Sequence, residues 1–161
     1  MSGFGSNERK TKKSKEKKIG TLQRDKLISN AFSLHSSGKL KQAADLYNFL
    51  IQNKIYDPGI FNNLGSIYSN LKQFDKAILL FDESIKKFPN SLEAYINLAH
   101  VMVIKGKSDI AKKILNTVIE LNPKYLKSYS NLAGIFVGEG NFEKAEFFLM
   151  KSLEISPKDI N

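Results

Sequence analysis

The sequence predicts an all-α fold, a solenoid of four stacked helix pairs that follows a basic tail. The first observation behind this prediction is a 34-residue period that runs from Arg24 to Pro157. The second is a pair of apolar stripes with i, i+3, i+4, i+7 spacing in each period, which is typical of amphipathic helices. The third is a set of small-residue columns. With the copies aligned, these columns read Ala31, Gly65, Ala99 and Ala133, then Ala43, Ala77, Ala111 and Ala145.

Each copy contains two helices and a turn. The expected helices are 22–37, 41–54, 58–71, 75–88, 92–105, 109–121, 126–139 and 143–155, in repeats 24–57, 58–91, 92–125 and 126–159. Within each pair the chain turns at Gly38, Gly106 or Gly140, because a left-handed helix end favours glycine, and Lys72 holds this place in the second copy. A column of Ile55, Pro89, Pro123 and Pro157 ends the second helices, since proline blocks helix continuation.

Small residues in the columns let two helices cross closely, where a larger side chain would push them apart. In the second copy one stripe contains Phe61, Leu64 and Tyr68, and the other contains Ala77 and Phe81. One helix pair cannot bury both stripes alone, so neighbouring pairs must stack.

The order and spacing of these residues resemble a known repeat. The second copy reads Phe61-x-x-Leu64-Gly65-x-x-Tyr68, then Ala77-x-x-x-Phe81, then Pro89. This pattern and its period resemble the tetratricopeptide repeat, TPR. The resemblance implies a right-handed α-solenoid whose first helices line a concave groove, and it implies a protein or an extended peptide as the partner.

Composition and motifs argue against several other classes. The chain has no cysteine, which excludes disulfides, zinc fingers and thiol nucleophiles. His35 and His100 lie in different repeats without metal-ligand spacing, and no phosphate-loop or hydrolase motif occurs. The glycines of the stretch 134–140 are interpreted as helix-crossing and turn residues. We therefore expect no enzyme activity, no metal and no cofactor. With no apolar run long enough for a membrane helix and no secretory signal, we expect a cytoplasmic protein.

The net charge of +9 is concentrated in the first 20 residues, where seven basic side chains face two acidic ones. This segment has too few large apolar residues to order itself, so we expect a disordered tail over 1–20 and the repeat array over 21–161. The tail could hold nucleic acid or a membrane surface nonspecifically, but it lacks aromatic and amphipathic patterns. We interpret it as a solubilising leader, with no specific nucleic acid or membrane partner.

Counted from 24, 58, 92 and 126, the groove should be lined by positions 2, 5, 6, 9, 12 and 13 of each repeat. The candidate peptide-binding residues are Asn62, Asn63, Ser66, Asn97, His100, Lys127 and Asn131. Position 6 resembles the asparagine ladder of O-GlcNAc transferases, in which carboxamides, each a donor and an acceptor, hold a peptide backbone. The alternative is that these asparagines bond to neighbouring helices and stabilise the fold.

A carboxylate clamp, as in chaperone-binding TPRs, fits poorly. Counted from the second repeat, Asn97 and Lys127 match the clamp, but Asn62 and Ser66 do not, and Asn131 replaces an arginine. We reject it.

The last helix carries more apolar residues than one face can bury: Phe147, Phe148, Leu149, Met150, Leu153 and Ile155. Stacked arrays normally close with a polar face, so the chain either continues or docks this end on another copy or a partner. The leading hypothesis is a noncatalytic TPR scaffold. The alternative is the substrate-recruiting arm of a peptide-modifying transferase whose catalytic domain lies outside these residues.

Overall fold

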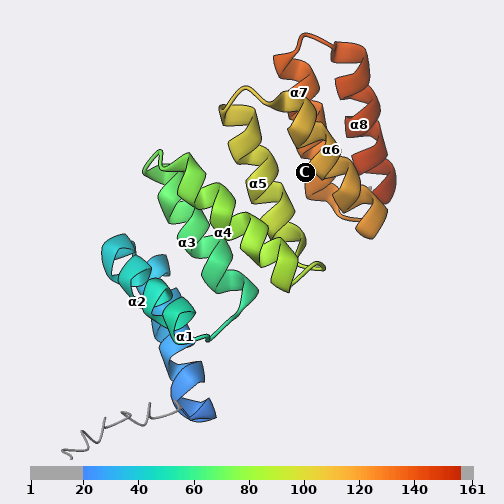
Figure 1. Cartoon of the computed structure of the whole chain (residues 1–161). Helices are drawn as coiled ribbons and strands as arrows, with labels where there is room; N and C mark the ends of the chain where they lie inside the picture. Colours follow the sequence, from blue (N-terminus) through green and yellow to red (C-terminus); the bar gives the residue numbers. More distant parts are fainter. Residues whose placement is uncertain (1–19, 157–161) are drawn as a thin grey trace, which may run out of the picture.

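A computed structural model describes residues 20–156, and these residues form eight α-helices without a strand (Figure 1). The helices are α1 (Thr21–Ser36), α2 (Leu40–Gln52), α3 (Pro58–Asn70), α4 (Phe74–Lys87), α5 (Leu92–Ile104), α6 (Ser108–Leu121), α7 (Leu126–Gly138) and α8 (Phe142–Ile155). Every observed bound lies within two residues of the bound expected from the sequence. The predicted tail lies outside the described residues except for Gly20.

The turn inside each pair has one conformation, which confirms the role of the glycine column. Gly38, Gly106 and Gly140 have φ angles of 75°, 70° and 71°, and Lys72 adopts the same left-handed conformation with φ 58°. In each turn the following residue donates its backbone N–H to the carbonyl five residues back, as Lys39 does to the Leu34 carbonyl at 2.9 Å. This hydrogen bond closes the first helix with a Schellman motif.

The joints between repeats have two conformations, and the proline column decides which one forms. Phe88 and Asn122 precede prolines and are outside the helical region, with φ of −135° and −148°, because proline disfavours the helical conformation of the residue before it. In the first repeat Ile55 replaces the proline. It keeps its N–H, which donates to the Leu50 carbonyl at 2.9 Å, and Lys54 takes a left-handed φ of 56°.

The small-residue columns lie where the two helices of a pair cross. All eight residues of these columns are buried. Gly65 shows why size matters here, because a Cβ added to it would lie 2.5 Å from the Phe81 ring. The crossing role expected for this column is therefore confirmed at Gly65.

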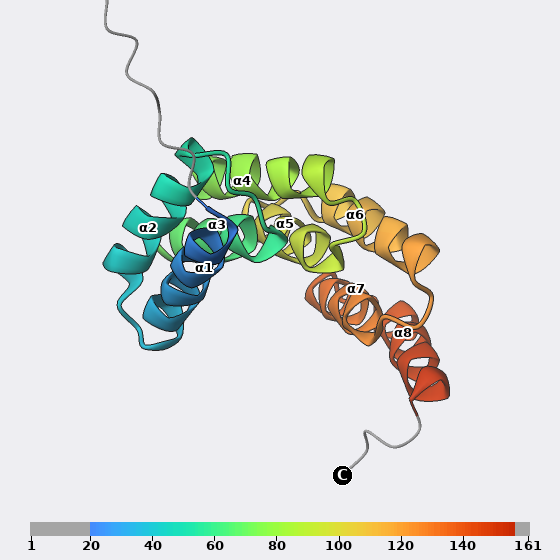
Figure 2. The same ribbon diagram turned by 90° about the horizontal axis from the view of Figure 1, so that it is seen from below.

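The four pairs stack into a curved array (Figure 2). Each of α2, α4 and α6 packs against the first helix of its own pair and against the first helix of the next pair. In Figure 2 the array curves across the view from α1 and α2 to α8, with α1, α3, α5 and α7 on the inner, concave side and the other four helices on the outer side. None of the described helices is long and apolar enough to cross a membrane.

Candidate functional site

The concave face is the candidate site, and its central polar feature is the column of asparagines at position 6. Asn63 donates from Nδ2 to the Tyr47 hydroxyl of α2 at 3.0 Å. That hydroxyl also lies 3.3 Å from Nδ1 of His35 on α1. Tyr47 is fully buried, and burial raises the pKa of its hydroxyl despite the opposing effect of the Asn63 hydrogen bond. Asn63 thus takes part in a polar network that joins the first three helices.

The other two asparagines of the column have different surroundings. Asn131 donates from Nδ2 to the Lys127 carbonyl of its own helix at 2.6 Å. Asn97 is half-buried, and its carboxamide has no hydrogen bond to any of the residues 20–156. One fold therefore places three identical side chains in three environments: tied to a neighbouring helix, tied to its own helix, and unengaged.

Asn62 and Ser66 are less open than their groove positions indicate. Only 8% of Asn62 is exposed, and its Oδ1 is buried without a hydrogen-bond partner among the described residues. The Ser66 hydroxyl donates to the backbone carbonyl of Asn62 at 2.8 Å. In this conformation the side chain of Asn62 is therefore too buried to reach a ligand, and the hydroxyl hydrogen of Ser66 is already used.

Lys127, expected in the groove, is engaged by an acidic neighbour. Its Nζ and the Tyr125 hydroxyl both donate to Oε1 of Glu93 at 2.7 Å. Burial is the largest single influence and raises the pKa of Glu93, but the hydrogen bonds from Lys127 and Tyr125, together with the charge of Lys127, lower that pKa by more. The pKa of Glu93 therefore lies below its usual 4.5. The three residues join α5 to the start of α7.

A hollow of about 340 Å³ opens on the concave side between α5 and α7. Its lining residues are Ala99, His100, Val103, Leu115, Ser130, Asn131, Gly134 and Ile135. His100 and Asn131, both singled out by the sequence, meet here. Asn63, Asn97 and Lys127 do not line this hollow.

The importance of Gly134 is missed by sequence reasoning, which interprets it as a helix-crossing residue. That interpretation is wrong, because Gly134 is exposed and a Cβ added to it would meet no atom within 4 Å. Position 9 holds Phe32, Ser66 and His100 in the other repeats, so the missing side chain at this position is what leaves the hollow open. The signal in the sequence is the glycine at a groove position rather than in a crossing column.

No set of three or more His, Cys, Asp and Glu side chains within residues 20–156 is arranged to hold a metal ion. The chemistry that this face offers consists of apolar contact, amide and hydroxyl hydrogen bonding, and paired charges.

Comparisons with known proteins agree with the repeat architecture. Two family models, each described as a tetratricopeptide repeat, match residues 70–125 and 126–159, together more than half of the chain. No curated protein matches the sequence closely enough to count as a relative.

Several solved structures share the fold. A crystal structure of MamA is 20% identical, with a TM-score of 0.72 over 84% of this chain and 79% of that one. MamA from Desulfovibrio magneticus RS-1 is also 20% identical, with a TM-score of 0.71 over 88% of this chain and 80% of that one. YrrB, described as a TPR protein with an unusual peptide-binding site, is 20% identical, with a TM-score of 0.70 over 85% of this chain and 71% of that one. At these identities the likeness concerns the fold.

Proposed function

The chain belongs to the tetratricopeptide repeat family, and we propose that it is a noncatalytic interaction module that binds an extended protein segment along its concave face. The hollow between α5 and α7 carries this proposal, because its apolar walls lie beside the polar groups of His100, Ser130 and Asn131. A site of this kind accepts an apolar side chain and fixes its orientation with a few hydrogen bonds.

The asparagines contribute unequally in this proposal. Asn97 and Asn131 offer carboxamide groups to a peptide backbone, since the Asn97 carboxamide has no hydrogen bond within residues 20–156 and only the Nδ2 of the Asn131 carboxamide is used. Asn63 supports the fold through Tyr47, so a peptide would have to displace an existing hydrogen bond there. The peptide-binding site named for YrrB supports a peptide ligand for this architecture. The alternative of a substrate-recruiting transferase arm gains no support from the described residues.

The experiment fills the hollow. Peptides selected from a random display library on the wild-type chain are titrated against Gly134→Leu, in which the new side chain occupies the space beside His100. Asn116→Leu is the matched control, because it also adds a leucine at an exposed helix position, but on α6 at the outer side of the array (Figure 2) and away from the hollow.

We expect Gly134→Leu to weaken binding about tenfold or more, which corresponds to about 1.4 kcal/mol, while Asn116→Leu binds like the wild type. Circular dichroism melts confirm that both variants fold. Selected peptides that bind Gly134→Leu and the wild type equally well would show that the segment binds elsewhere.

A further inference from the structure

The two ends of the solenoid differ in chemistry. Positions 7 and 10 of the first helices contact the preceding pair in repeats two to four, where Leu64, Ile67, Leu98, Val101, Leu132 and Ile135 are buried. In α1 the same positions hold Asn30 and Ser33, both exposed, and position 3 holds the exposed Lys26. The N-terminal end of the described array therefore finishes with a polar face.

The other end finishes with an apolar face on α8. Leu149 is 48% exposed, whereas its equivalents Tyr47, Phe81 and Leu115 are at most 1% exposed. Met150 and Leu153 beside it are 53% and 38% exposed. The first helix of the next repeat covers the equivalent surfaces of α2, α4 and α6. In Figure 1, no helix of the described part lies on the far side of α8.

A hollow of about 480 Å³ lies next to this apolar face, where a following first helix would lie. It is lined by Leu126, Ser130, Leu149, Ser152, Leu153 and Ser156. The α8 face, defined here as Leu149, Met150 and Leu153 with this hollow, repeats the surface on which each interior first helix rests.

We propose that the α8 face binds an amphipathic helix of a partner protein, docked as the first helix of a fifth pair would dock. The interior interfaces specify that helix. At position 3 they use the buried Ile60, Ala94 or Ser128, at position 7 always leucine, and at position 10 isoleucine or valine. The partner helix therefore carries a small or apolar residue at i, leucine at i+4 and a β-branched residue at i+7.

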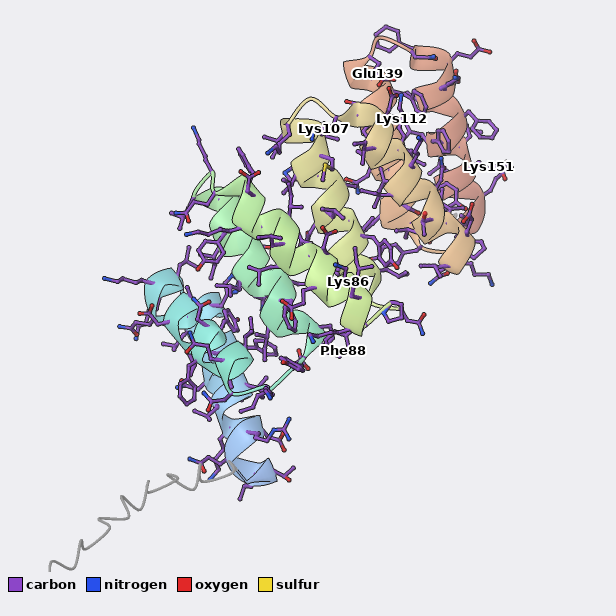
Figure 3. The ribbon with its side chains drawn as sticks, viewed as in Figure 1. Lys86, Phe88, Lys107, Lys112, Glu139 and Lys151 are labelled. Carbon is purple, nitrogen blue, oxygen red and sulfur yellow. The ribbon has the colours of Figure 1, made fainter. Side chains whose placement is uncertain are left out.

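Charge adds a fourth requirement. Two ion pairs between repeats join position 14 of a first helix to the preceding second helix. Lys105 lies 2.6 Å from Asp75 at position 18. Glu139 lies 3.0 Å from Lys112 at position 21, and Figure 3 labels both of these residues.

On α8, positions 18 and 21 are Glu143 and Glu146, both acidic and exposed. The partner helix therefore carries lysine or arginine at i+11, which is also where the helix dipole favours a cation.

A second copy of this chain stacked head to tail does not meet these requirements. Its α1 would present Lys26, Asn30, Ser33 and Ser37 at i, i+4, i+7 and i+11. The chain's own α5 does meet them, with Ala94, Leu98, Val101 and Lys105. A peptide of residues 92–106 is therefore a defined probe, and its Lys105→Glu version is a matched control.

The test is an NMR titration of the isotope-labelled full chain with each peptide. With the wild-type peptide we expect shifts on α8 and at the start of α7, and no shifts at His100 on the concave face. Leu149→Glu should weaken binding about tenfold or more, the effect expected for an anchor residue. Leu79→Glu replaces an apolar residue that is 69% exposed on the outer side of α4, and it should bind like the wild type.

Charge reversal tests the fourth requirement independently of folding defects. The Lys105→Glu peptide should bind the wild type roughly threefold to tenfold more weakly, and Glu146→Lys in the protein should reverse this preference. Three outcomes would overturn the proposal: shifts confined to the concave face, no shifts at millimolar peptide, or a wild-type dimer in sedimentation equilibrium that Leu149→Glu converts to monomer. Shifts confined to the concave face would overturn only the proposal for the α8 face, and equal peptide binding by Gly134→Leu and the wild type would overturn only the proposed function, so the two proposals fail separately.

Discussion

Single side chains decide how closely the helices approach and which polar groups remain for a ligand. Gly65 and Gly134 illustrate both roles, the first buried at position 8 of its repeat and the second exposed at position 9. The first faces the Phe81 ring with no room for a side chain, and the second faces open space. Glycine therefore permits close packing at one position and leaves open space at the other. The effect of replacing a glycine is predicted by the atoms that surround it.

Gly65→Ala should lower the free energy of unfolding by about 1–3 kcal/mol, because its Cβ forces the Phe81 ring to move within a packed core. Gly138→Ala should be neutral or raise the free energy by up to about 1 kcal/mol, since alanine favours the helix and nothing lies near the new methyl group. Urea unfolding curves measure both. A larger loss for Gly138→Ala than for Gly65→Ala would contradict the helix register described here.

Asn63→Ala should lower the free energy of unfolding by about 0.5–1.5 kcal/mol, because the hydrogen bond to the buried Tyr47 is lost. Asn97→Ala should leave it nearly unchanged, since the Asn97 side chain has no hydrogen bond within the described residues. A double-mutant cycle with Tyr47→Phe isolates the Asn63 contribution. If Asn97→Ala proved the more destabilising of the two, the assignment of Asn63 to the fold and of Asn97 to the ligand would fail.

At the scale of elements, the turns and joints fix how one helix leads into the next. Four turns within pairs share a left-handed residue, and glycine occupies three of them. Lys72 and Lys54 adopt the same conformation with a side chain, which is unfavourable for an L-residue other than glycine or asparagine.

Lys72→Gly should therefore raise the free energy of unfolding by up to about 1 kcal/mol, because glycine adopts a positive φ without steric cost. Gly106→Ala should lower it by about 1 kcal/mol for the same reason. Thermal melts monitored by circular dichroism compare the two variants with the wild type. Equal melting temperatures for all three would mean that these turns carry no strain.

At the scale of the whole molecule, stability is a sum of pairs and of the interfaces between them. The Glu93, Tyr125 and Lys127 cluster is one such interface, since it joins the third repeat to the fourth. α8 lies at the other extreme, because no following helix covers its outer face within the described residues.

Acid should weaken the interface between the last two repeats. The pKa of Glu93 in the folded chain lies below its unfolded value of 4.5, so the stability that Glu93 contributes is present above that pH. It is lost as the pH falls through the folded-state pKa. Urea unfolding at a series of pH values between about 6 and 3 should show a loss of stability that Glu93→Gln reduces. A steeper acid dependence in Glu93→Gln would contradict the sign of this shift.

The end of the array should open first. Amide hydrogens of α8 should exchange with solvent faster than those of α4 and α6, because those helices are covered on both sides and α8 is covered by α7. Hydrogen exchange measured by mass spectrometry or NMR tests this order. Comparable protection of α8 and α6 would indicate that the apolar face of α8 is already covered in solution.

The sequence by itself determined the number of helices in residues 20–156, their bounds to within two residues and the positions of the tight turns. These features repeat at one period and depend on local rules: apolar spacing, glycine at positive φ and proline after a helix. The burial of the alanine columns follows from the same period, because a residue repeated at every crossing must fit every crossing.

Only the tertiary structure decided which asparagines are engaged and where the concave face is hollow. Asn63, Asn97 and Asn131 share one position in the repeat, yet their side chains differ in hydrogen bonding. Asn63 donates to a residue of a neighbouring helix, Asn131 donates to its own helix, and the Asn97 carboxamide has no partner among the described residues. The hollow at Gly134 depends on the distance between α5 and α7 as well as on the missing side chain. A period fixes what recurs along the chain, whereas a site depends on contacts between residues that do not recur.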